Sequence, residues 1–252
     1  MTAPIPKRRR VALVTGGSQG LGGVIVRTFH REGFAVAIGD IAFDKAADVA
    51  QSLDASGATA RALMLDVRKK DHFSDALDQL SDWGGVDVLV NNAAMTMTTA
   101  VMDIEPDEFD AVMAVNLRGP FFGCQVIGAH MQARGSGRII NISSQAGQMG
   151  GTVAGAHYAA SKAGVILLTK YFAREFGASG VTVNSVAPGA LDFPAVRAAF
   201  PPERVKALEA MIPVKHLGNP DEVAAAVALL ARADMAYVTG ATWDINGGML
   251  MR

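Results

Sequence analysis

The feature that most constrains the fold of this chain is a regular alternation of short apolar runs with longer amphipathic segments. The short runs are continuously apolar, which is typical of strands that are buried on both faces of a sheet. The expected strands are Val11–Thr15, Phe34–Gly39, Ala60–Leu65, Val86–Val90, Arg138–Ile142, Val181–Val186 and Ala241–Ile245. Segments with helical spacing lie between them. The sequence therefore predicts an α/β fold, a single doubly wound Rossmann-type parallel sheet with helices on both faces.

The segments with helical spacing connect these strands in order. They are 24–30, 42–56, 70–83, 105–133, 157–176 and 221–231. No linker, repeat or low-complexity segment interrupts the alternation, so we predict a single domain over residues 1–252. Within it, residues 1–9 are expected to form a flexible tail. Residues 190–215 are expected to form an irregular, proline-punctuated insert beside the substrate.

Composition excludes several classes of function. The net charge is −1, so nothing favours a nucleic-acid groove or an anionic membrane surface. The single cysteine, Cys124, excludes a disulfide framework and a cysteine-based zinc site, and no metal is predicted. No segment approaches the roughly 18 apolar residues that cross a bilayer. We expect a cytoplasmic protein with no membrane partner.

A glycine-rich turn follows the first expected strand and opens the first helix. Glycines allow the backbone to approach a pyrophosphate, and the N-terminus of the helix offers free N–H groups. The turn, TGGSQGLG, departs from the common G-x-G-x-x-G spacing, and an ordinary tight βα turn is the alternative. Its candidate cofactor-binding residues are Gly16, Ser18, Gln19, Gly20, Leu21 and Gly22.

Polar residues also follow the next strands, where ligands bind in such folds. Asp40 can accept hydrogen bonds from both adenosine ribose hydroxyls and would repel a 2′-phosphate. Gln19 and Ile41 supply no cation, so the sequence predicts NAD in preference to NADP. A role for Asp40 as a helix N-cap is the alternative, and both roles are compatible.

Two further pairs at strand ends are candidate cofactor contacts. Asp66 could accept from the adenine amino group, with Val67 beside it. Asn92 and Ala93 could line the adenosine side or tie neighbouring strands. Turn stabilisation is an equally good explanation for each pair taken alone.

The segment after the fifth strand carries groups that can move a proton. Tyr158 and Lys162 are four residues apart and so share one helix face, and a serine pair precedes them at the strand end. Free tyrosine has a pKa of about 10, too high for a base near neutrality. Positive charge from Lys162 and from an oxidised nicotinamide would lower the pKa of Tyr158. The tyrosine would then serve as acid or base for hydride transfer.

These motifs together resemble the short-chain dehydrogenase/reductase family over essentially the full chain. The matching pieces are TGGSQGLG at 15–22, NNAA at 91–94, Asn116 in VMAVNLRG, NISS at 141–144, YAASK at 158–162 and NSVAPG at 184–189. The resemblance implies an oxidoreductase that is usually a homotetramer. It implies Asn116, Ser144, Tyr158 and Lys162 as the catalytic set, with Ser143 as the alternative to Ser144. By resemblance, Lys162 also holds the nicotinamide ribose and Asn116 supports a water relay.

The resemblance also adds cofactor contacts and shows two departures. Besides Tyr158 and Lys162, it implies contacts at Pro188, Gly189 and Leu191. The family often has a threonine where this chain has Phe193, so contact there would have to come from the backbone, as at Leu191. NNAA replaces the more usual NNAG, a change that we expect to be tolerated.

The substrate is less constrained than the reaction. Candidate substrate-binding residues are Ser144, Gln145, Gln148 and Tyr158. Our main hypothesis is an NAD-dependent dehydrogenase for a small secondary alcohol, polyol or sugar-like substrate. The first alternative is a 3-oxoacyl-[acyl-carrier-protein] reductase. Two residues argue against it: Asp40 favours NAD, and Ser179 stands where those reductases usually keep a basic residue for the acidic carrier. The second is a dinucleotide-sensing protein without turnover, although the intact catalytic set argues against it.

Overall fold

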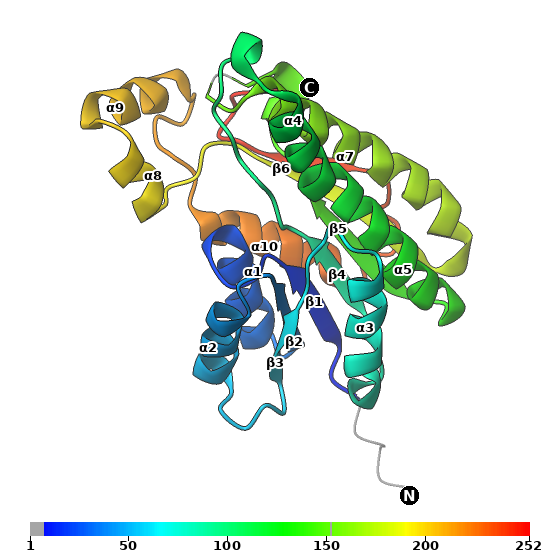
Figure 1. The fold of residues 1–252 in the computed structure, drawn as a ribbon. Coiled ribbons are helices and arrows are strands. Elements are labelled where there is room, and N and C mark those ends of the chain that lie inside the picture. The colour runs from blue at the N-terminus through cyan, green and yellow to red at the C-terminus, as the bar shows by residue number, and fades with distance from the viewer. Residues whose placement is uncertain (1–7, 152) are drawn as a thin grey trace, which may run out of the picture.

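The computed structural model describes residues 8–151 and 153–252, and its centre is a seven-stranded parallel sheet (Figure 1). The strands occur in the order β3-β2-β1-β4-β5-β6-β7. They are β1 (Val11–Thr15), β2 (Ala35–Asp40), β3 (Ala60–Met64), β4 (Val88–Asn91), β5 (Gly137–Ile142), β6 (Val181–Pro188) and β7 (Thr242–Ile245). All the neighbours pair in parallel, so the predicted doubly wound α/β sheet is confirmed.

Helices connect the strands and cover both faces of the sheet (Figure 1). They are α1 (Gly20–Arg31), α2 (Phe43–Leu53), α3 (Asp71–Gln79), α4 (Pro106–Met113), α5 (Gly119–Ala133), α6 (Ala146–Met149), α7 (Ala156–Phe176), α8 (Pro194–Ala199), α9 (Pro202–Met211) and α10 (Pro220–Ala231). One core contains α1, α2 and α10, and the other contains α3, α5 and α7. Short 3₁₀ helices form at residues 81–83, 101–103 and 177–179.

Alternate residues of β1 show why its sequence is apolar throughout. Ala12 and Val14 lie in the core beside α1 and α10, and Val11 and Leu13 lie in the core beside α3 and α5. All four are at most 1% exposed. A strand that faces two buried layers must be apolar at every position, and burying each such side chain stabilises the fold by about 1.5–3 kcal/mol.

The sheet order places the switch in chain direction between β1 and β4. The chain runs outward from β1 to β2 and β3 and then returns to β4 on the other side of β1. Ligands of open α/β sheets bind beyond the carboxyl ends of the strands at such a point. The carboxyl ends of β1, β2, β4 and β5 carry the polar residues singled out in the sequence.

The segment 105–133 is divided, which the helical spacing did not predict. A π-helical stretch, Ala114–Arg118, separates α4 from α5, and the N–H of Gly119 donates to the carbonyl of Ala114, five residues earlier. Pro120 has no N–H and cannot make the i→i−4 bond of an α-helix, so the hydrogen-bonding pattern changes here. Asn116 lies within the stretch and is fully buried.

The ends of the predicted domain need one correction. Residues 1–7 lie outside the described residues, but Arg8 is not part of a free tail. Its guanidinium pairs with Asp87 at 2.7 Å and donates to the carbonyl of Trp83 at 2.8 Å.

The insert at 190–215 forms α8 and α9, which project from one end of the sheet (Figure 1). No helix in the described part of the chain is long and apolar enough to cross a membrane.

Candidate active site

The glycine turn after β1 is built for close backbone approach. Gly16 and Gly20 have φ values of +63° and +54°, a region that favours glycine. A Cβ at Gly22 would lie 2.1 Å from the carbonyl oxygen of Gly16. Helix α1 starts immediately after Gln19, whose side chain makes no capping bond to the described chain. The turn therefore leaves N–H groups of the first helical turn available to an anion.

Asp40, at the end of β2, lies beside this turn. Its carboxylate accepts from the N–H of Ser18 at 3.1 Å and from that of Ala42 at 3.0 Å, and the residue is 9% exposed. It therefore stabilises the glycine turn and the loop before α2 instead of capping that helix. Ile41 is 64% exposed at the rim.

The polar residues after β3 and β4 make different contacts within the protein. The carboxylate of Asp66 is paired with Arg68 at 2.8 Å, which holds the pKa of Asp66 below its usual range. Asn92 donates to the carbonyls of Thr15 and Gly16 at 2.9 and 3.0 Å, so it ties β4 to β1. Both residues nevertheless line one cavity with the glycine turn.

That cavity has a volume of about 580 Å³ and brings together most of the predicted cofactor-binding residues. It is lined by Gly16, Gln19, Gly20, Leu21, Gly22, Asp40, Ile41, Ala42, Leu65, Asp66, Val67, Arg68, Asn92, Ala93, Ala94, Met95, Thr96 and Val115. Ser18 is behind the turn, and its Oγ is buried without a partner among the described residues. A glycine cradle, unpaired helix N–H groups and an acceptor for ribose hydroxyls fit a nicotinamide dinucleotide.

The predicted catalytic residues lie near one another at the end of β5. Lys162 is 2% exposed, and its ammonium donates to the carbonyl of Ile142 at 2.8 Å and lies 5.7 Å from the ring centroid of Tyr158. Tyr158, Ser144 and Thr96 line one cavity, and the side chains of Ser144 and Thr96 are near enough to the hydroxyl of Tyr158 to influence its pKa. Ser143 is excluded as the alternative, since its hydroxyl donates to the carbonyl of Val186 at 3.0 Å inside the sheet.

Asn116 acts on the loop that follows β4. Its side chain accepts from the N–H of Met95 at 2.7 Å and donates to the carbonyl of Met95 at 2.9 Å. It also donates to the hydroxyl of Ser161 on α7 at 3.2 Å. Asn116 therefore joins the loop that carries Thr96 to the helix that carries Tyr158 and Lys162.

The sequence predicts a lowered pKa for Tyr158 beside Lys162 and an oxidised nicotinamide, whereas the surroundings of Tyr158 in the protein alone raise that pKa. Burial raises the pKa of Tyr158, and the side chains of Ser144 and Thr96 act in the opposite direction without reversing the shift. Burial also lowers the pKa of Lys162, to about 8. A protonated phenol next to a mostly protonated ammonium is the form needed to donate a proton to a carbonyl oxygen.

A second cavity of about 270 Å³ opens at Tyr158 and Ser144 and shares Thr96 with the first. It is lined by Thr96, Thr98, Ser144, Gln145, Ala146, Met149, Gly150, Gly151, Val153, Ala154, Tyr158, Gly189, Ala190, Leu191, Val196, Phe200, Leu208 and Met249. Gly189 and Leu191, which were predicted as cofactor contacts, line this second cavity and not the first. Pro188, within β6, accepts from the N–H of Gln145 at 3.0 Å through its carbonyl.

The two predicted glutamines separate. Gln145 lines the cavity, and its Oε1 is buried without a partner in the described chain. Gln148 was predicted wrongly as a substrate contact. Its amide donates to Asp244 on β7 at 2.5 Å, because one turn of α6 directs it away from the cavity. Phe193, where a threonine was noted as missing, is the N-cap residue of α8.

Thr96 is a site residue that the sequence analysis missed. It lines both cavities, and its side chain acts to lower the pKa of Tyr158. It lies in a run of methionines and threonines, MTMTT, with no periodicity that would single it out. Only its distance along the chain from the Asn pair could have suggested a position beyond β4.

This arrangement defines an α/β oxidoreductase in which a half-buried Ser144 and Tyr158, with the buried Lys162, adjoin a dinucleotide cavity. A family model described as enoyl-(acyl carrier protein) reductase matches residues 16–250. The chain belongs to the short-chain dehydrogenase/reductase family, as its motifs predicted.

Relatives with the same name cover almost the whole chain. The 3-oxoacyl-[acyl-carrier-protein] reductase FabG of Vibrio cholerae is 39% identical over 243 residues, which are 96% of this chain and 98% of that protein. FabG of Staphylococcus epidermidis is 40% identical over 242 residues, 95% and 98% of the two chains. The crystal structure of a blue fluorescent protein from a metagenomic library, in complex with NADPH, superposes with a TM-score of 0.86. It is 35% identical and covers 96% of this chain and 98% of its own.

Proposed function

We propose that this protein is a nicotinamide-dependent ketoreductase whose substrates are 3-oxoacyl thioesters. The observation that carries the proposal is that Ser144 and Tyr158 open into a cavity whose other walls are largely apolar. Met149, Val153 and Phe200 contribute to these walls, and an acyl chain can bury apolar surface against them. A polyol or sugar would need hydrogen-bonding partners there, so our main hypothesis from the sequence loses support. The names of the relatives favour the 3-oxoacyl alternative.

The proposed chemistry assigns one role to each residue of the site. The reduced nicotinamide, when bound, supplies hydride to the carbonyl carbon of the substrate. Tyr158 donates its phenolic proton to the carbonyl oxygen, so that the C=O group becomes CH–OH. Ser144 hydrogen-bonds the same oxygen and orients it. The ammonium of Lys162 stabilises the phenolate that remains until a proton from water restores the phenol.

The carrier of the acyl group is a separate part of the proposal. Ser179, in the 3₁₀ turn after α7, offers no positive charge to an acidic carrier protein. We propose that recognition depends on the acyl thioester itself, so that small thioesters serve as substrates.

A substrate panel tests the proposal. Purified protein would be assayed with NADH and NADPH against acetoacetyl-coenzyme A, a 3-oxoacyl N-acetylcysteamine thioester and a 3-oxoacyl carrier protein. In the oxidative direction it would be assayed with NAD⁺ and NADP⁺ against polyols, cyclic alcohols and sugars. Reduction of the small thioesters with the highest kcat/KM is the expected result. A preference for polyols or sugars would overturn the proposed substrate class. Turnover confined to the carrier protein would overturn only the proposal on the carrier.

We further propose that the cofactor is NAD(H) in preference to NADP(H), although a similar protein was crystallised with NADPH. Asp40 supports this, since its carboxylate faces the cavity beside the glycine turn. Arg68 is the one cation that lines this cavity within the described chain, and it is paired with Asp66. A 2′-phosphate placed there would meet a negative charge at short range.

Replacing Asp40 by Asn should weaken this preference. The amide oxygen can still accept from the N–H of Ser18, but the charge is removed. The ratio of kcat/KM for NADH to that for NADPH should fall by about tenfold, equivalent to about 1.4 kcal/mol. Asp44→Asn serves as a control, because it removes one negative charge at an exposed position of α2, and it should leave the ratio unaltered. An unchanged ratio in Asp40→Asn, or a wild-type preference for NADPH, would contradict this role.

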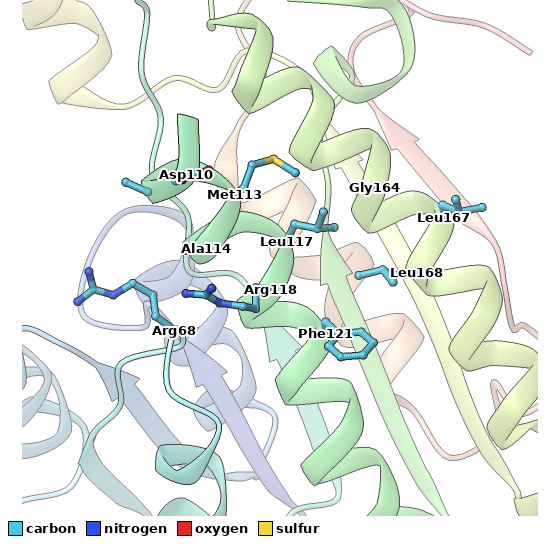
Figure 2. Close-up of a pocket in the computed structure, with 11 residues that line it drawn as sticks. Arg68, Asp110, Met113, Ala114, Leu117, Arg118, Phe121, Gly164, Leu167 and Leu168 are labelled. Atoms are coloured by element: carbon cyan, nitrogen blue, oxygen red, sulfur yellow. The ribbon is translucent and has the colours of Figure 1, made fainter. Parts of the chain in front are cut away.

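We also propose that copies of this chain assemble into a homotetramer through the face formed by the π-helical stretch, α5 and α7. A hollow of about 860 Å³ lies on this face. Figure 2 shows residues that line it, among them Leu117 and Phe121, which lie opposite α7. Leu167 and Tyr171 of α7 are 56% and 62% exposed. Apolar side chains gathered at this exposure are typical of a protein–protein contact.

A charge at the centre of this face should disrupt the assembly. Leu167→Glu is expected to convert the tetramer into smaller species, because two buried carboxylates would lose their hydration. Size-exclusion chromatography with light scattering would measure this. Met64→Glu, at a residue 49% exposed on the outer strand β3, serves as a control and should stay tetrameric. A monomeric wild-type protein would rule the assembly out.

A further inference from the structure

The residue before Tyr158 is a buried histidine that the chemistry above does not use. His157 is 1% exposed and lies in the first turn of α7. Its Nε2 lies 2.8 Å from Oε1 of Glu108, in the first turn of α4. Since an ionised carboxylate can only accept, Nε2 is the donor in this bond. The bond joins the first turns of α4 and α7, two helices that are far apart in the sequence.

The histidine ring is enclosed by three segments. It stacks with Phe109 at a centroid separation of 6.5 Å and an interplanar angle of 21°. It packs against Gly155, where an added Cβ would lie 2.6 Å from Cε1 of the ring. Gly155 in turn donates its N–H to the carbonyl of Met97 at 2.8 Å. His157 therefore lies where α4, the start of α7 and the loop that carries Thr96 meet.

The start of α7 depends on side-chain contacts of this kind. The first N–H groups of any helix have no partner within the helix, so its first turn is less firmly held than its centre. The N-cap residue of α7 is Gly155, which has no side chain to supply a cap. Besides the site residues Tyr158 and Lys162, two side chains in the first two turns of α7 bond to side chains of other segments within the described chain. They are His157, to Glu108, and Ser161, to Asn116.

We infer that His157 and Glu108 form a positioning pair, which holds the hydroxyl of Tyr158 in place against Thr96 and Ser144. Neither residue of the pair touches the reacting atoms. The bond sets the position of the first turn of α7 relative to α4, and Gly155 transmits that position to the loop at Met97. The inference rests on the proposed function only in taking Tyr158 as the proton donor.

Four variants test the pair. His157→Phe keeps the ring and its packing but removes the donor, and His157→Gln restores a donor in place of Nε2. Glu108→Ala removes the acceptor at a side chain that is 24% exposed, so it should fold even if His157→Phe does not. Thr169→Val is the matched control. It removes a buried polar bond, to Asn141 at 2.9 Å, from the distant half of the same helix.

Each variant would be measured for kcat, KM and NADH affinity on the carbonyl compound that the wild type reduces best. We expect His157→Phe and Glu108→Ala to lower kcat by about tenfold to a hundredfold, since small misplacements of a reacting group cost rates of this order. KM and NADH affinity should change by less than about threefold, the size of a 0.6 kcal/mol effect. His157→Gln should recover most of kcat. Thr169→Val should lose stability while keeping kcat.

Amide hydrogen exchange gives a readout that does not depend on turnover. Peptides covering 93–100 and 155–162 should exchange faster in His157→Phe and Glu108→Ala, while peptides of α5 remain unchanged. A wild type that reduces no carbonyl compound would defeat the proposed function, yet these exchange rates would still test the pair. If both variants keep the wild-type kcat, or if their exchange is unchanged in the two peptides, the positioning role is refuted.

Discussion

Tyr158→Phe should lower kcat by about 10²–10⁴-fold, the usual contribution of a positioned acid or base. The substitution removes one oxygen atom and keeps the ring that packs near Lys162. Hydride transfer would then leave a developing negative charge on the substrate oxygen with no proton to neutralise it. Because the ring remains, the affinity for NADH should be nearly unchanged, and the loss should appear in kcat.

Steady-state kinetics together with a fluorescence titration of NADH would separate these effects. Tyr237→Phe is a suitable control, since Tyr237 is fully exposed and lines neither cavity. It should behave as the wild type does. Full activity in Tyr158→Phe would show that another group donates the proton. A loss of NADH binding equal to the loss of rate would show that the tyrosine serves only to bind the cofactor.

Lys162→Met should lower kcat by about a hundredfold or more and at the same time make the protein more stable at neutral pH. The rate falls because the phenolate of Tyr158 loses the positive charge that stabilises it. Stability rises because the ammonium is fully buried, which lowers its pKa from 10.5 to about 8. Such a shift corresponds to about 3 kcal/mol of destabilisation below pH 8. The variant also lacks the hydrogen bond to the carbonyl of Ile142, which costs about 1 kcal/mol. We therefore expect the free energy of unfolding to rise by about 2 kcal/mol in total.

The pH dependence of this gain follows from the sign of the shift. Between pH 8 and pH 10.5 the unfolded chain binds more protons at Lys162 than the folded protein does, so the free energy of unfolding of the wild type rises with pH. Met cannot titrate, so the gain should be lost as the pH approaches 10.5, and the variant should then be slightly less stable than the wild type because it lacks the bond to the carbonyl of Ile142. Urea denaturation at pH 7 and pH 10.5 would measure it, with the other ionisable groups cancelling in the comparison. A variant that is less stable than the wild type at pH 7 would contradict the cost assigned to burial.

Both predictions concern residues whose roles were visible in the linear sequence. The spacing of Tyr158 and Lys162 places them on one helix face whatever the helix packs against. Their elements are long and strongly patterned, and the strand before them is apolar throughout, so α/β alternation predicted the sheet and its helices closely. The residues of the glycine turn were found for the same reason, since their function depends on the backbone of one short segment.

Contacts between segments far apart in the chain were not predictable in this way. The roles of Thr96 and Asn116 depend on the meeting of the loop after β4 with α7. The orientation of Gln148 depends on α6, a single turn of helix that is too short to show a periodic pattern in the sequence. The histidine bond to Glu108 spans 49 residues. Local pattern carries no information on which of many polar side chains will meet.

The sequence by itself determined the fold class, the family and the chemical groups of the site. The tertiary structure decided which surroundings these groups have and how those surroundings shift their pKa values, as Tyr158 shows. The sequence predicts that an ammonium and an oxidised nicotinamide lower the pKa of the phenol, whereas the protein surroundings taken alone raise it by desolvation. Burial is a property of all the segments that surround a group, so its cost cannot be obtained from neighbours along one helix.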